Sequence, residues 1–170
     1  MPWERIQCRS AFRWRSGARV ANRAFIGHLQ RNKVKDVVPV ASAVDCVDSL
    51  RLAQALSERS QALGRTVPVL LQVNIDREPQ KFGASPESVP DLVAAVRHLP
   101  GLRLDGLMMI PRATDDAQLA RPSFGALREI AHGLGLRELS MGMSHDFEVA
   151  VEEGATLVRV GTAIFGERPG

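Results

Sequence analysis

The chain has 170 residues, 45% of them hydrophobic, which suits one globular domain with a sizeable core. It has no apolar run near the roughly 20 residues of a membrane-spanning helix, and its two cysteines make no disulfide framework, so the composition favours the reducing cytoplasm. The formal net charge is +3, but residues 1–23 contribute +5, and the near-neutral remainder offers no basic stripe for nucleic acid.

Residues 1–23 differ from everything that follows. They hold both tryptophans and six of the 19 arginines, with no helical or strand period. Three interpretations compete: an Arg-rich leader, a basic arm for nucleic acid or a membrane surface, and a misplaced start or shifted reading frame joined to a real domain. We favour the third because the pattern becomes orderly abruptly at Ala24. The sequence therefore predicts an atypical segment over 1–23 and a barrel domain over 24–170.

From Ala24 onward, strand and helix patterns alternate. The strands are predicted at 24–26, 40–44, 67–73, 104–110, 139–141 and 157–160. The helices are predicted to begin at 32–35 and to cover 49–63, 92–99, 117–132 (broken at Pro122) and 146–151. This rhythm indicates a parallel (β/α)8 barrel of the TIM type. Because such barrels have eight strands, two βα units must come from elsewhere or the chain is incomplete.

The last two predicted units carry an anion cradle. Ser144 stands where the N-cap of a helix is expected, and Gly154 where that helix would end. Gly161 and Thr162 follow the next strand directly. Two strand-to-glycine turns on consecutive units bring backbone N–H groups and hydroxyls to one end of the sheet. In (β/α)8 barrels that end often binds a phosphate.

Two polar residues at strand positions are further candidates. Arg159 lies between Val158 and Val160, so its guanidinium is expected to point into the barrel, where it needs hydrogen-bond acceptors. An arginine that reaches the rim or pairs with a structural carboxylate is an equally good interpretation. Asn74 ends an apolar strand and is expected to make a polar contact inside the barrel mouth.

Other chemistry-bearing residues carry weaker expectations. His28 either faces the ligand end or is an ordinary turn histidine. Asp76 and Glu78 lie in a polar loop and are expected to be solvated rather than an acid/base pair. Cys46 has no partner pattern for a nucleophile. The remaining histidines show no metal-ligand spacing with either cysteine, so no metal site is predicted.

Four segments resemble the pyridoxal-phosphate homeostasis protein family, over about residues 25–168. They are GHLQRNKVK (27–35), LLQVNIDREPQKFG (70–83), LDGLMMIP (104–111) and LSMGMSHDFEVAVEEGATLVRVGTAIFGER (139–168). The resemblance implies a barrel like the N-terminal domain of alanine racemase, here apparently lacking its first two βα units. It also implies a soluble, cytoplasmic protein that binds pyridoxal 5′-phosphate (PLP) and buffers or delivers it, without established catalytic turnover.

The resemblance also assigns roles to residues. Ser140 or Ser144, with the backbone of Gly161 and Thr162, would hold the PLP phosphate, and Arg159 would sit at the pyridine nitrogen. A cation that donates to this nitrogen disfavours its protonation and weakens the electron sink of PLP chemistry. Alanine racemase shares this feature and does catalyse, so the argument only lowers the expectation of enzymatic activity.

The chain departs from the family at the covalent tether. The family holds the PLP aldehyde as a Schiff base on a lysine in a Val-Ser-Lys-like motif, on a first strand that should precede Phe25. The only lysines here are Lys33, Lys35 and Lys81, and Lys81 matches a different loop lysine of the family. We therefore expect weak, noncovalent PLP binding, mainly through the phosphate.

The expected partners are PLP itself and PLP-dependent apoenzymes, with no nucleic acid and no membrane, for a monomer or weak homodimer. Two alternatives stay open. One is a nonfunctional or partner-dependent barrel fragment with open sheet edges. The other, less favoured, is a racemase- or decarboxylase-like PLP enzyme, which would need a base, a covalent lysine and a second domain.

Overall fold

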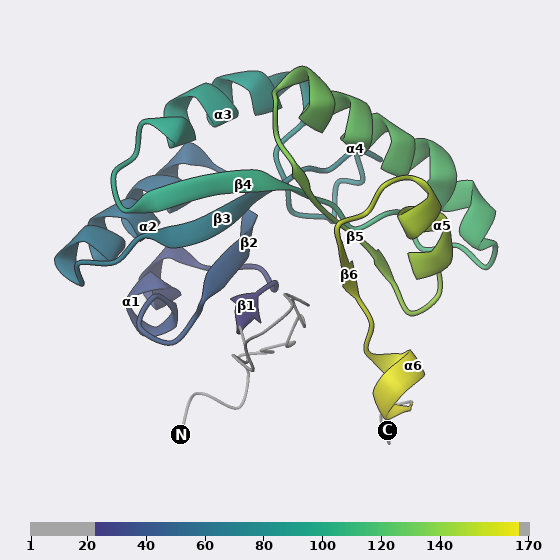
Figure 1. The fold of residues 1–170 in the computed structure, drawn as a ribbon, viewed down its shortest axis with the longest axis horizontal. Coiled ribbons are helices and arrows are strands. Elements are labelled where there is room, and N and C mark those ends of the chain that lie inside the picture. The colour runs from purple at the N-terminus through teal and green to yellow at the C-terminus, as the bar shows by residue number, and fades with distance from the viewer. Residues whose placement is uncertain (1–22, 167–170) are drawn as a thin grey trace.

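A single parallel sheet of six strands organises the computed structural model, which describes residues 23–166. The strands follow one another in sequence order across the sheet, which curves as an arc with β1 at one end and β6 at the other (Figure 1). They are β1 (Ala24–Phe25), β2 (Ala43–Val47), β3 (Val67–Gln72), β4 (Leu102–Met108), β5 (Glu138–Met143) and β6 (Leu157–Arg159). The arrangement is a parallel half-barrel, consistent with part of the expected TIM-type barrel.

Helices connect consecutive strands and cover the convex side of this arc (Figure 1). The connecting helices are α1 (Val34–Val37), α2 (Leu50–Ala62), α3 (Val89–Arg97), α4 (Arg121–Gly133) and α5 (Phe147–Glu152), and α6 (Thr162–Phe165) follows the last strand. Among the described helices, none has the length and apolar character needed to cross a lipid bilayer. Every neighbouring pair of strands is parallel, so the carboxyl ends of all six strands lie at one edge of the sheet.

The core lies between the sheet and the helices. β3 is almost entirely buried, as its unbroken apolar sequence predicts for a central parallel strand. The largest fully buried side chains include Leu56 of α2, Leu71 of β3, Leu107 of β4 and Phe124 of α4. Fully burying side chains of this kind contributes about 1.5–3 kcal/mol each. The core between the sheet and the helices is therefore the main source of the protein's stability.

Two predicted elements differ from the structure. β2 begins at Ala43 rather than at Val40, because the Arg65 guanidinium donates to the carbonyls of Val38 (2.5 Å), Pro39 (3.0 Å) and Ala41 (3.0 Å) and holds this stretch as a turn. The helix predicted over 117–132 is divided close to Pro122, but at its start rather than in its middle: a 3-10 turn (Ala117–Ala120) is followed by α4 (Arg121–Gly133). This proline lies in the first turn of α4, where its missing N–H has no helical partner to lose.

Other boundaries agree closely. α2 was predicted over 49–63 and spans Leu50–Ala62, and Ser85 takes the N-cap position of the short 3-10 turn (Pro86–Ser88) that precedes α3. The atypical segment predicted over residues 1–23 lies, apart from Arg23, outside the described residues. The domain boundary predicted there therefore stays a prediction.

Candidate anion-binding site

The two turns that follow β5 and β6 meet at the carboxyl edge of the sheet. Parallel pairing sets Met143 of β5 opposite Arg159 of β6, so both chains leave the sheet side by side. The Gly161 N–H then donates to Ser144 Oγ at 3.1 Å. Thr162, at the start of α6, is exposed next to this contact. The structure thus brings Ser144, Gly161 and Thr162 together, with hydroxyls and backbone amides at one place.

The role predicted for Ser144 as N-cap is wrong. Asp146 occupies that position before α5, and its Oδ1 accepts from the Met143 N–H at 2.6 Å. The Asp146 N–H in turn donates to the Met143 carbonyl at 3.1 Å, so Asp146 closes the turn by itself. Because the turn is closed in this way, the Ser144 hydroxyl points to the neighbouring turn at Gly161.

Arg159 lies beneath these turns, with only 8% of its surface exposed. Its Nη1 donates to Ser140 Oγ at 2.8 Å, and its Nη2 donates to the Met109 carbonyl at 2.6 Å. A guanidinium buried in this way needs such acceptors. The guanidinium therefore sits inside the half-barrel rather than at its rim, and it links β6 to β5 and to Met109, the residue after β4.

The two candidate serines consequently differ in position. Ser140 is fully buried and holds the Arg159 guanidinium, whereas Ser144 lies in the turn beside Gly161. Gly142 separates them with a φ of +89°, and a Cβ there would lie 2.6 Å from the Ala150 Cβ. The turn after β5 is therefore pressed directly against α5, as only glycine allows.

Asn74 organises the loop at the mouth of the half-barrel. Its Oδ1 accepts from the Glu78 N–H at 3.1 Å, while its Nδ2 donates to the carbonyls of Glu78 (2.9 Å) and Lys81 (3.3 Å). The side chain also lines a cavity of about 210 Å³ at this mouth. Asn74 thus lies where the sequence predicted, and the described contacts of its amide shape the loop.

The same mouth cavity contains His28 and Lys81. The His28 ring lines this cavity and stacks on Phe82 with centroids 3.6 Å apart, so this histidine lies at the mouth and is also packed within its turn. The cavity is lined by Ile26, Gly27, His28, Gln72, Asn74, Gln80, Lys81, Phe82 and Ile110. Lys81 Nζ donates to the Pro111 carbonyl at 2.6 Å and pairs with the Glu78 carboxylate. An ammonium engaged in this way is a poor nucleophile.

Asp76 and Glu78 were expected to be solvated, but both carboxylates contact other groups of the protein. Glu78 is buried against Lys81, and Asp76 accepts from the Arg112 N–H at 2.6 Å and from Ser123 Oγ at 2.5 Å. The contacts of Asp76 tie the loop after β3 to the loop after β4 and to the first turn of α4. The sequence did not show this, because the partners are more than 30 residues away.

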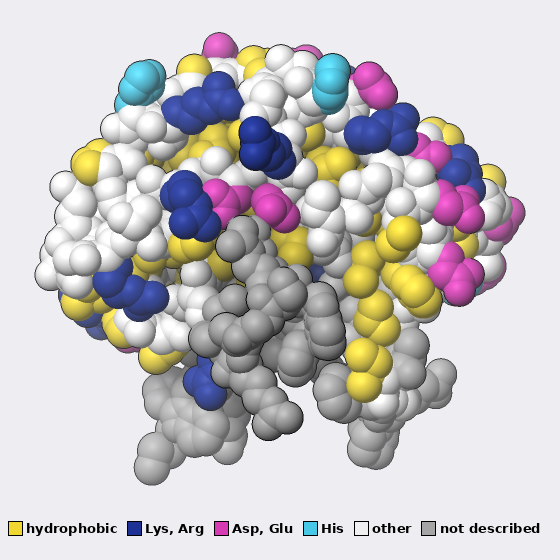
Figure 2. Space-filling model, viewed as in Figure 1, with side chains coloured by type: hydrophobic (Ala, Val, Ile, Leu, Met, Phe, Trp, Pro, Cys, Tyr) yellow, Lys and Arg dark blue, Asp and Glu magenta, His cyan; other side chains and the backbone are white. Residues whose placement is uncertain are grey.

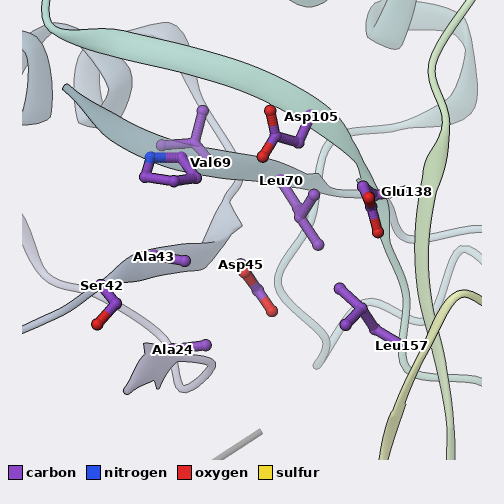
Figure 3. Close-up of a pocket in the computed structure, with 10 residues that line it drawn as sticks. Ala24, Ser42, Ala43, Asp45, Val69, Leu70, Asp105, Glu138 and Leu157 are labelled. Carbon is purple, nitrogen blue, oxygen red and sulfur yellow. The ribbon is translucent and has the colours of Figure 1, made fainter. Parts of the chain in front are cut away.

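A second cavity, of about 160 Å³, lies at the amino ends of the strands, away from the cradle (Figure 3). Asp45, Asp105 and Glu138 line it together with Leu70 and Leu157. Asp105 is held by Arg103 through bonds of 2.7 and 2.8 Å. The sequence analysis does not single out these acidic residues, although Asp45 inside the apolar segment AVDCV (43–47) is a usable signal of a buried carboxylate.

Neither metal binding nor thiol chemistry is supported among the described residues. No group of three or more His, Cys, Asp or Glu side chains within residues 23–166 is placed to hold a metal ion. Cys46 is buried, and this burial, with a smaller contribution from Asp45 and Asp48, raises the pKa of its thiol far above the ordinary value. Cys46 is therefore a core residue.

The model of the family "alanine racemase, N-terminal domain" matches residues 13–169. The chain belongs to this family. Its curated relatives include the pyridoxal phosphate homeostasis protein of Pseudomonas aeruginosa, which is 47% identical over 146 residues, or 85% of this chain and 64% of that one. The protein of the same name from Aquifex aeolicus is 41% identical over 85% of this chain and 66% of its own. The resemblance seen in the sequence is thus confirmed, and the chain spans about two thirds of the length of these family members.

Solved structures of family members show the same fold. PipY of Synechococcus elongatus PCC7942, with PLP bound, is 35% identical and superposes with a TM-score of 0.78, over 84% of this chain and 69% of that one. Its structure without PLP gives a TM-score of 0.80. The alanine racemase of Clostridium difficile 630, at 19% identity and a TM-score of 0.64, shares the fold.

Proposed function

We propose that this chain binds PLP and serves in PLP homeostasis, holding the cofactor by its phosphate at the cradle. The single observation that carries the proposal is the Gly161 N–H···Ser144 Oγ bond, which joins the turns after β5 and β6. The relatives named pyridoxal phosphate homeostasis proteins, and PipY with PLP bound, support the same ligand. The donor set suits it, because hydroxyls and amides accommodate a phosphate and a buried guanidinium lies beside them.

Each residue of the site has a role in this proposal. Ser144 and Thr162 would donate hydroxyls to the phosphate, and Gly161 would donate its backbone N–H to it in place of the present bond to Ser144 Oγ. Arg159 would donate to the pyridine nitrogen, with Ser140 fixing its guanidinium. Asn74 would keep the mouth loop in place. Bound PLP can act as an electron sink, and a guanidinium at the nitrogen disfavours the protonated ring that this requires. We therefore propose storage and delivery to PLP-dependent apoenzymes rather than catalytic turnover.

The binding mode that we propose is noncovalent. The sequence has three lysines, and Lys33 and Lys35 are exposed around the start of α1. Lys81 is held by Glu78 and Pro111. Two cysteines are too few for a disulfide framework, so we propose that the protein acts in the reducing cytoplasm. We propose a monomer or weak homodimer as the acting form.

Titration of the chain with PLP, pyridoxal and inorganic phosphate tests this proposal. PLP should bind, phosphate should compete with it, and pyridoxal should bind at least about tenfold more weakly, because the phosphate contacts are charge-assisted. Ser144→Ala should lower the affinity for PLP more than the affinity for pyridoxal. Ser88→Ala, at an exposed serine far from the cradle in the chain, is the matched control. Equal affinity for PLP and pyridoxal would overturn the proposal.

The open sheet favours one alternative, a fragment that needs a partner. Hydrophobic side chains follow β6 toward α6 along the edge of the arc, and Ile164 is 67% exposed there (Figure 2). Exposed strand edges readily pair with another chain. Light scattering during a thermal scan, repeated on dilution, distinguishes the two. A monomer that unfolds cooperatively supports the proposed function, whereas a chain that stays folded only while it is part of an assembly supports the alternative.

A further inference from the structure

Helix α5 links the two halves of the candidate site. It spans only Phe147–Glu152, between the turn that carries Ser144 and the strand that carries Arg159. Helices shorter than about 12 residues are marginal on their own, so the orientation of α5 depends on its contacts. Val149 and Ala150 supply buried apolar contacts on its inner side. On its outer side, ion pairs connect the end of α5 to α4.

Glu153, which follows the last residue of α5, makes that charged contact. Its Oε1 accepts from Arg121 Nη1 at 2.8 Å, and its Oε2 accepts from Arg128 Nη1. Arg128 Nη1 also donates to the Glu153 carbonyl, at 3.2 Å. Arg121 and Arg128 are seven residues apart on α4, which places them on one face of that helix. One carboxylate thus bridges two arginines that lie about two turns apart on the neighbouring helix.

The contact is better shielded than an ordinary surface ion pair. The Glu153 side chain is 15% exposed, whereas that of the adjacent Glu152 is 60% exposed. Hydrogen bonds from Arg121 and Arg128 lower the pKa of Glu153, and hydrogen bonds to acidic partners raise the pKa of both arginines. Figure 2 shows acidic and basic side chains lying together over this α4–α5 end.

Glu153 is close in the chain to both parts of the cradle. Gly154 follows it with a φ of +94°, and two residues later the Thr156 N–H donates to the Leu139 carbonyl at 3.0 Å, which sets β6 beside β5. On the other side, α5 presses on the β5 turn, since a Cβ at Gly142 would meet Ala150. Along the chain, Glu153 thus lies between the turn that carries Ser144 and the turn that carries Gly161.

We propose that Glu153 is a positioning residue for the phosphate-binding turns, acting through its bridge to Arg121 and Arg128. The inference rests on the proposed function, because it deepens the account of the same site. Glu153 touches no ligand in this scheme. It fixes the spacing between the turns after β5 and β6.

Glu153→Gln in the full chain tests the inference. The matched control is Glu152→Gln, which removes the carboxylate of an exposed neighbour that pairs with Arg121 but not with Arg128 in the described contacts. The first readout needs no ligand: the exchange rate of the Gly161 amide by NMR, compared with the amides of β3. Glu153→Gln should accelerate Gly161 exchange about three- to tenfold and leave β3 unchanged. The second readout is affinity for PLP and for inorganic phosphate, which should fall by a similar factor, while Glu152→Gln should stay within about twofold.

The outcomes separate the two proposals. Unchanged Gly161 exchange overturns the role of Glu153, and so does an equal acceleration of the β3 amides, which would mean a general loss of stability. If the unaltered chain binds neither PLP nor phosphate, the proposed function fails, and the Gly161 exchange rate still decides whether Glu153 sets the turns.

Discussion

Arg159 and Ser140 form a buried pair at the base of the cradle, with the guanidinium Nη1 2.8 Å from the serine Oγ. The two residues lie on neighbouring strands, β6 and β5, and both are enclosed by the half-barrel. The serine hydroxyl is thus an acceptor for a buried cation. This relationship makes Ser140 a determinant of where the guanidinium points.

Ser140→Ala should therefore destabilise the protein and weaken PLP binding together. A buried charged donor that loses its acceptor costs about 1–3 kcal/mol, more than a typical neutral hydrogen bond. Urea unfolding measures this cost, and Ser88→Ala, at an exposed position, serves as the control with an expected change within about 0.5 kcal/mol. A Ser140→Ala variant as stable as the control would show that Arg159 does not depend on this hydroxyl.

Gly142→Ala should cost more than Gly64→Ala. Both glycines have positive φ, +89° and +61°, but only at Gly142 does an added Cβ meet another atom, the Ala150 Cβ at 2.6 Å. Gly64→Ala should cost about 1–2 kcal/mol for the left-handed backbone alone. Gly142→Ala should add about 1–3 kcal/mol of overpacking to that. Equal losses in urea unfolding would mean that α5 moves aside freely.

The ion pairs of Glu153 predict a pH dependence of stability. Its pKa is lowered in the folded chain, so the unfolded chain takes up the proton first as pH falls. The stability from these pairs is present above the ordinary glutamate pKa of about 4.3, and it is lost as pH drops through the lower folded value. The unfolding free energies of the native chain and Glu153→Gln should therefore converge in acid. A constant difference down to the lowest accessible pH would contradict this origin.

Much of the fold could be predicted because local patterns and tertiary packing agree. β3 is apolar on both faces and is central, and the apolar stripe of α2 lies against the sheet. The boundaries failed where a distant residue decides them. Arg65 holds residues 38–41 as a turn, and no local signal announces a guanidinium that arrives from 24 to 27 residues away.

The site shows the same division. Strand-end glycines and Arg159 were visible as a pattern, because parallel strands bring their carboxyl ends to one edge. The separate positions of Ser140 and Ser144 were not, since both stand near a glycine. The β5–β6 register pairs Arg159 with Met143, and only the three-dimensional course of its side chain brings the guanidinium to Ser140. Glu153 escaped the sequence analysis altogether. Its partners lie on α4, and a glutamate before a helix-ending glycine is an unremarkable surface pattern.

Lys81→Arg should leave PLP binding nearly unchanged. Arginine keeps the cation that pairs with Glu78 and donates toward Pro111, but it cannot form a stable covalent bond with an aldehyde at neutral pH, because its guanidinium stays protonated. If binding is noncovalent, affinity should change by less than about threefold, because the cation that pairs with Glu78 is kept. Lys35→Arg, at an exposed lysine of α1, is the matched control.

Borohydride treatment followed by mass spectrometry completes the test of the noncovalent mode. A PLP adduct at Lys81 that disappears in Lys81→Arg, together with most of the affinity for PLP, would show a covalent mode instead.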